Sequence, residues 1–226
     1  MSKYYYDKES LPNKFYLFSY GANNIKQLSK TLRYNDNIED NLKLSCIGLK
    51  IFGYHRDFFG NSKRWQGAIA TISPKKFNCV DGICLLIEKQ NNNYKNNNIL
   101  VNFDNLLNRE EFPSTYILEK ISNDQEPITP SQSDNNIPII AFVVNPTYVP
   151  KTNAIVNEKY LTAILKTLID YRYLKIQNNK LFRKYYLPYD RNNIFSKYLN
   201  KPYCIEINYV NNIFPSITHK FVIKDL

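Results

Sequence analysis

The chain has 226 residues and a mass of 26.7 kDa, with 43% hydrophobic and 22% charged residues. This composition is that of an ordinary folded protein, and the length suits one domain with an extension or two small domains. No apolar run approaches the ~20 residues of a membrane helix, and the residues after Met1 form no apolar signal-peptide core. We therefore expect a cytoplasmic protein with no membrane span.

The net charge of +10 is unevenly distributed. Residues 1–150 contain 17 Lys and Arg against 15 Asp and Glu, whereas residues 151–226 contain 13 against 5. The basic part alternates cations with aromatic residues, as in Phe-Arg-Lys-Tyr-Tyr at 182–186. Such a segment can bind nucleic acid or an acidic partner, but a solvated Lys-rich face has the same pattern, so both interpretations stay open.

Four cysteines and two histidines show no zinc-binding spacing, so we expect no metal site. Cys79 and Cys84 lie in apolar, strand-like surroundings, where a reduced thiol is expected. Because the chain has only two histidines, acid–base chemistry would fall to a carboxylate.

The first predicted element is an apolar strand at 15–20 that stops at Gly21 and leads directly into a helix at 24–33. Such a junction leaves N–H groups unpaired at the positive end of the helix dipole, where a carboxylate or phosphate can bind. Gly21 permits a sharp turn and a close approach of a ligand, and Asn23 is predicted as the N-cap. The same junction is also common where nothing binds, so this motif alone does not decide the function.

The rest of the chain predicts an α+β fold. Strand patterns occur at 44–53, 66–74, 79–88, 116–121 and 137–144, and helical patterns at 102–109 and 158–171. Pro74 is expected to end a strand. We interpret 90–98 as an Asn-rich surface loop and 122–136 as a mobile Pro/Ser/Asp-rich segment. Beyond residue 171 only short strand-like pieces occur, at 203–210 and 221–223.

Six short motifs in this order resemble the gamma-glutamylcyclotransferase-like (AIG2-like) family. They are Tyr20–Asn23, Gly53–Phe58, Trp65–Gly67 with Ala70–Pro74, Val80–Gly82, Asn108–Glu110 followed by Tyr116, and Ala141–Val144. The resemblance implies a small mixed β-barrel with flanking helices at 1–171. Residues 172–226 would then be a basic, Tyr-rich C-terminal extension of unknown role.

The resemblance also implies an enzyme, a transferase or lyase, that needs no metal or cofactor. Its small-molecule substrate would be a gamma-glutamyl amine, amino acid or peptide, cyclised to 5-oxoproline with release of the amine. Glu110 would be the general acid/base. The N–H groups of Gly21, Ala22, Asn23 and Asn24 would hold the substrate α-carboxylate. Tyr20 and Tyr116 are expected to line the pocket or to serve packing, and Arg56 and Trp65 to be structural or to touch the ligand.

Two residues depart from the family pattern. Ala22 replaces a serine and so removes a hydroxyl, and Glu111 replaces a glycine and so adds a charge. The alternative is therefore a catalytically inactive member that acts as a binding or interaction module. It would work with or without nucleic-acid or acidic-partner binding through 172–226. Whether Glu110 or Glu111 is the base stays open, as do the gamma-glutamyl compound used and the oligomeric state.

Overall fold

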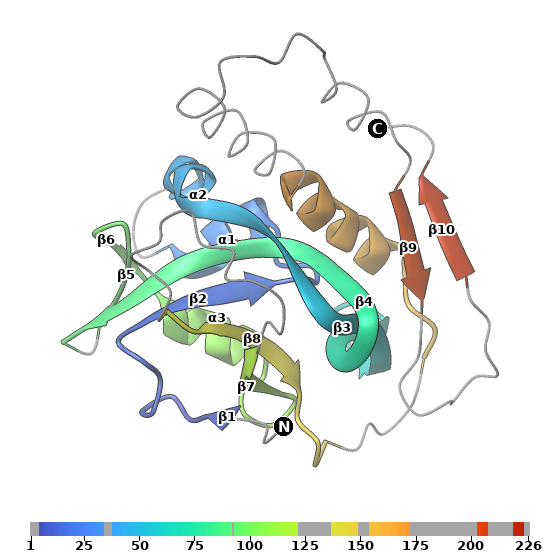
Figure 1. Ribbon diagram of the computed structural model, residues 1–226, viewed down its shortest axis with the longest axis horizontal. Helices are drawn as coiled ribbons and strands as arrows, with labels where there is room; N and C mark the ends of the chain where they lie inside the picture. Colours follow the sequence, from blue (N-terminus) through green and yellow to red (C-terminus); the bar gives the residue numbers. More distant parts are fainter. Residues whose placement is uncertain are drawn as a thin grey trace, which may run out of the picture.

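The computed structural model describes residues 5–33, 38–91, 93–121, 137–148 and 154–171, together with the backbone of 203–207 and 219–223. An eight-stranded sheet runs in the order β1-β7-β8-β2-β4-β5-β6, with β3 paired to β4 (Figure 1). Its strands are β1 (Tyr5–Tyr6), β2 (Lys14–Ser19), β3 (Cys46–Ser62), β4 (Gly67–Gln90), β5 (Asn93–Asn96), β6 (Ile99–Val101), β7 (Tyr116–Ile121) and β8 (Ile139–Val144). The helices are α1 (Ile25–Leu32), α2 (Glu39–Ser45), α3 (Phe103–Arg109) and a helix at 158–171. A separate antiparallel pair joins β9 (Tyr203–Ile207) to β10 (His219–Ile223).

The predicted α+β class is confirmed, but the predicted barrel is wrong. β1 and β6 are the two ends of the sheet, and no pairing joins them within the described residues. The sheet curls instead within the β3–β4 hairpin, whose register shifts after Phe52 and after Phe59. Gly53 and Gly60 lie at these bulges with φ of +82° and +64°, in the left-handed region that glycine adopts freely. Bulges bend the strands without closing the sheet.

Pro74 does not end its strand. β4 continues through it to Gln90, but residues 75–78 have no partner on β3. Pro74 itself is paired with Tyr54, and the interruption begins directly after it, a position beside a bulge where sheets tolerate proline.

The Asn-rich segment 90–98 was predicted as a loop, and this is also wrong because it contains β5. Tyr94 and Asn96 of this strand are buried. Asparagines carry the positive φ values at both of its tight turns, namely Asn91, Asn97 and Asn98. The asparagines thus serve the turns of a small meander.

The predictions of α3, β7 and the helix at 158–171 are confirmed, and β8 matches to within two residues. Both short strand-like pieces near the end of the chain overlap strands, β9 and β10. The segment 122–136 lies outside the described residues. So does the predicted extension 172–226, except for the backbone of β9 and β10.

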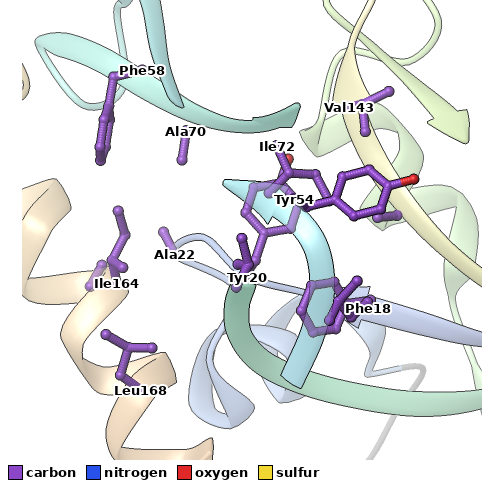
Figure 2. Close-up of a cluster of buried hydrophobic side chains, with 14 of the residues drawn as sticks. Phe18, Tyr20, Ala22, Tyr54, Phe58, Ala70, Ile72, Val143, Ile164 and Leu168 are labelled. Atoms are coloured by element: carbon purple, nitrogen blue, oxygen red, sulfur yellow. The ribbon is translucent and has the colours of Figure 1, made fainter. Parts of the chain in front are cut away.

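The sheet has a hydrophobic core on each face. β2 contributes to both, because Phe15 and Leu17 join the core formed with α1, α2 and α3, whereas Tyr16 and Phe18 join the core formed with the helix at 158–171. In this second core Ile164 and Leu168 lie close to Ala22 (Figure 2). Burying each large apolar side chain contributes roughly 1.5–3 kcal/mol. The loop that follows β2 is therefore anchored at the meeting point of two cores.

Candidate active site

A cavity of about 490 Å³ opens where the loop after β2 meets the β3–β4 turn and the end of α3. This volume is in the range of small-molecule sites. Its walls come from segments far apart in the sequence, which the sheet brings together. The lining residues that bear on chemistry are Tyr20, Gly21, Ala22, Asn23, Lys63, Arg64, Trp65, Arg109, Glu110, Glu111, Tyr116 and Tyr160.

The loop at 20–23 is held by its carbonyl groups. All four carbonyl oxygens accept hydrogen bonds from groups that pack around the loop. The Tyr20 carbonyl accepts from the Arg56 guanidinium (2.8 and 3.1 Å), and the Gly21 carbonyl accepts from Thr167 Oγ1 (2.7 Å). The Ala22 carbonyl accepts from the Asn24 N–H (3.0 Å), and the Asn23 carbonyl accepts from Ser19 Oγ (2.7 Å). The orientation of each peptide in the loop is therefore fixed.

The N–H groups of the same loop are available to a ligand. Across the described ranges, no hydrogen bond uses the N–H of Gly21, Ala22 or Asn23, and all three residues line the cavity. The Asn24 N–H is already bonded to the Ala22 carbonyl, and Asn24 does not line this cavity. Three of the four residues whose N–H groups were named from the sequence thus line the cavity.

The start of α1 is already occupied by groups of the protein. The N-cap is Asn24, whose Oδ1 accepts from the Gln27 N–H at 3.0 Å, so the prediction of Asn23 as N-cap is wrong by one residue. The Ile25 N–H donates to Asp170 Oδ2 at 2.8 Å. Burial raises the pKa of Asp170, and the bond from Ile25 partly offsets this. The free donors at this cavity therefore belong to the preceding loop and not to the first turn of α1.

Glu110 caps the C-terminus of α3 and has a side chain only 17% exposed. Its Oε1 accepts a hydrogen bond from Asn23 Nδ2 at 3.1 Å, which joins α3 to the loop. Arg109 Nε lies 3.9 Å from the same oxygen, and it is a buried atom with no hydrogen-bond partner. Burial raises the pKa of Glu110, while the Asn23 bond and the charges of Arg109 and Arg64 oppose the rise.

Glu111 also lines the cavity, but its carboxylate is bonded to a different partner. It is exposed, and its Oε2 accepts from Thr115 Oγ1 at 2.7 Å. Its φ of +51° lies in the left-handed region, which explains why glycine would suit this position. Of the two adjacent carboxylates, Glu110 is the one buried against the loop.

Four tyrosines line the cavity, and the hydroxyl groups of Tyr20, Tyr116 and Tyr160 differ in what they can still donate. Tyr20 donates to the Phe142 carbonyl, and Tyr116 donates to the Ala70 carbonyl at 2.7 Å. Tyr160 instead accepts from the Ala70 N–H at 2.9 Å, so its own hydroxyl proton stays available. Tyr160 was missed from the sequence, because on an amphipathic helix it looks like any other core residue.

Arg56 has a structural role, since both of its contacts are main-chain carbonyl groups, those of Tyr20 and Asp81. Trp65 lies at the cavity and packs against Tyr160, with ring centroids 4.9 Å apart. In the described parts of the chain, no group of three or more His, Cys, Asp and Glu side chains could hold a metal ion. Among the described helices, none is long and apolar enough to span a membrane.

No protein-family model matches the chain, and no curated protein matches it. Solved structures with a similar fold include one named gamma-glutamyl cyclotransferase, at 14% identity and a TM-score of 0.43, covering 82% of this chain and 98% of that one. An uncharacterized protein from Homo sapiens matches at 16% identity and a TM-score of 0.39, covering 84% and 100%. A gamma-glutamyl cyclotransferase specific to glutathione from yeast matches at 11% and 0.38, covering 75% and 97%. These values describe a likeness of fold and assign no activity to this chain.

Proposed function

We propose that this chain cyclises a gamma-glutamyl compound to 5-oxoproline and releases its amine, with Glu110 as general acid/base. The observation that carries the proposal is the mostly buried Glu110 carboxyl beside a loop with three free N–H groups. An amino-acid end carries a carboxylate and an ammonium group on one carbon. The loop N–H groups suit the carboxylate, and Glu110 suits the neighbouring ammonium.

The reaction moves two protons from the attacking nitrogen to the leaving nitrogen, because the α-ammonium group becomes a ring N–H and the amine is released as an ammonium ion. Glu110 removes a proton from the substrate α-ammonium, and the freed amine attacks the γ-carbonyl carbon. A new C–N bond closes the five-membered ring, and the original amide C–N bond breaks. The leaving nitrogen takes the first proton from Glu110 as this bond breaks. The ring nitrogen then gives its second proton to Glu110, from which the released amine takes it up to become an ammonium ion. Nucleophile and electrophile belong to one molecule, so holding the folded substrate supplies much of the rate.

The environment of Glu110 suits this exchange. Burial raises the pKa of Glu110 above its ordinary value, and a higher pKa makes the carboxylate a better acceptor for the ammonium proton. The bond from Asn23 fixes the position of Oε1. The hydroxyl proton of Tyr160 is a further donor for the substrate. A cytoplasmic location remains an expectation from the sequence.

The proposal is tested by incubating the purified protein with gamma-glutamyl dipeptides, gamma-glutamyl-ε-lysine and glutathione, and following 5-oxoproline by mass spectrometry. Glu110→Gln keeps the size of the side chain but cannot take up the proton. We expect it to lose at least about a hundredfold in rate, as general acid–base catalysis contributes ~10²–10⁴. Glu111→Gln is the matched control and should keep its activity. Equal rates for wild type and Glu110→Gln would contradict the role of Glu110.

The second candidate is a binding module without turnover, favoured by Ala22, which offers no hydroxyl to a substrate. Comparing turnover with binding distinguishes the two candidate functions. If no compound of the panel gives 5-oxoproline but calorimetry detects binding of one, the binding module is supported and the cyclisation is not.

A further inference from the structure

The β3–β4 turn places two cations at the rim of the cavity. Lys63 and Arg64 are exposed and line the cavity. Neither has an ion-pair partner among the described residues. Their positive charge is therefore not neutralised by a carboxylate of the protein.

The Arg64 side chain is supported by stacking. Its guanidinium carbon lies 5.3 Å from the centroid of the Trp65 ring, and Trp65 packs in turn on Tyr160 at 4.9 Å. Stacking holds one face of a guanidinium and leaves its N–H groups along the edge free to bind a carboxylate in two-point geometry. Arg64 is thus connected through Trp65 to Tyr160, a cavity-lining residue of the helix at 158–171.

The carboxylates on the other side of the cavity are engaged elsewhere. Glu110 accepts from Asn23, and Glu111 accepts from Thr115. The Arg64 charge nevertheless reaches the site, since it is one of the charges that lower the pKa of Glu110. A second anionic group on a bound substrate would meet positive charge at this turn.

We propose that the turn at 63–65 is a subsite for a carboxylate on the leaving amine, with Arg64 as the anion-binding residue. This inference rests on the proposed cyclisation, and it narrows the substrate class to gamma-glutamyl amino acids or peptides in preference to simple gamma-glutamyl amines. The loop at 21–23 binds the carboxylate at the glutamyl end, and Arg64 binds the one at the other end. Substrates with two carboxylates are thus held across the cavity.

The test uses two substrates that differ only in this carboxylate, gamma-glutamylalanine and gamma-glutamylethylamide. We expect wild type to favour gamma-glutamylalanine about tenfold in kcat/KM, the size of a partly exposed charge-assisted hydrogen bond. Arg64→Gln should bring the ratio close to one, and Arg64→Lys should retain part of the preference. Lys75→Gln removes an exposed cation that does not line the cavity and should keep the full ratio. Equal use of both substrates by wild type, or an unchanged ratio in Arg64→Gln, would overturn the subsite.

Failure of the cyclisation itself is distinguished by binding. Calorimetry with Glu110→Gln measures the affinity of both compounds without turnover. A preference for gamma-glutamylalanine that disappears on adding Arg64→Gln supports the subsite even if wild type releases no 5-oxoproline. Equal affinities would reject the subsite whatever the activity.

Discussion

The burial of Glu110 favours its proposed catalytic role but lowers the stability of the folded protein. Its carboxyl is mostly buried, and within the described residues its one ion pair, with Arg109, is long at 3.9 Å. Ionising a buried carboxyl without a close partner weakens the folded state. The proposed catalytic group is therefore expected to destabilise the fold at neutral pH.

This effect has a defined dependence on pH. The pKa of Glu110 is raised in the folded protein. At any pH between the pKa of Glu110 in the unfolded state and its pKa in the folded state, the folded protein therefore binds more protons than the unfolded one. Wild-type stability should fall from about pH 4.3, the ordinary glutamate pKa, until the folded pKa is passed, and the effect is constant above it. Glu110→Gln lacks this loss, so its free energy of unfolding should rise relative to wild type over that window. Urea unfolding of both proteins from pH 4 to 8 measures the difference, and a difference independent of pH would contradict the prediction.

At this scale the sequence, through its family resemblance, indicated most of the residues that gather at the cavity. Glu110 and three loop residues were among them, because these belong to short contiguous motifs. The N-cap was missed by one residue, since Asn23 and Asn24 are equally good caps and only the fold shows that Asn24 turns towards Gln27. Tyr160 and Arg64 belong to no motif, and their position depends on contacts made across the fold.

Among the elements, the helix at 158–171 holds the candidate substrate loop and the start of α1 in place by hydrogen bonds. We call these contacts the clamp. Thr167, Asp170 and Ala163 lie about one turn apart and meet consecutive parts of 21–25. The contacts fix the Gly21 carbonyl, the Ile25 N–H and the Asn24 side chain.

Thr167→Val tests this clamp by removing the hydroxyl donor to the Gly21 carbonyl with little change in shape. We expect a loss of about 1–3 kcal/mol in unfolding free energy, because a buried carbonyl loses its partner. A loosened loop should also raise KM severalfold while kcat falls less. Thr162→Val is the control, since Thr162 is exposed and bonds only within its own helix. An equal change in KM for Thr167→Val and Thr162→Val would show that the contact of Thr167 with the loop has no role in substrate binding.

Local patterns predicted which segments become strands more reliably than where strands end. Periodicity is a property of a single segment. Whether a strand continues past Pro74 depends instead on how it pairs with its neighbouring strand. Here four residues of β4, 75–78, lie opposite Gly53 alone, so the pairing is interrupted directly after Pro74. The buried side chain of Tyr94 likewise stabilises a strand in a segment whose composition is that of a loop.

In the whole molecule, β2 pairs with β4 between the two cores, and Gly82 of β4 lies against the end of β2. A Cβ at Gly82 would lie 2.4 Å from the Ser19 carbonyl oxygen and 2.7 Å from the Phe18 ring. Gly82→Ala must therefore push β2 away from β4, at about 1–3 kcal/mol or more. Gly53→Ala meets no atom within 4 Å and should suffer only from its φ of +82°, about 1 kcal/mol. Thermal unfolding of both variants compares them, and an equal or smaller loss for Gly82→Ala would be contrary to expectation.

The fold class could be predicted from the alternation of strands and helices, but the closure of the sheet could not. Whether end strands meet depends on accumulated twist and on bulges, and no single segment of sequence encodes their sum. Here the sheet ends at β1 and β6 and the curl is confined to one hairpin.

The exposed β3–β4 turn has a consequence for evolution and engineering. Residues 63 and 64 contribute no buried side chain, so substitutions there should change stability by less than about 0.5 kcal/mol. The residues proposed for the chemistry lie instead in the loop at 20–23 and at the end of α3. A lineage could therefore exchange one leaving group for another by mutating the turn alone, with the cyclisation machinery left intact. The same turn is the natural position to randomise in a library that seeks new substrates.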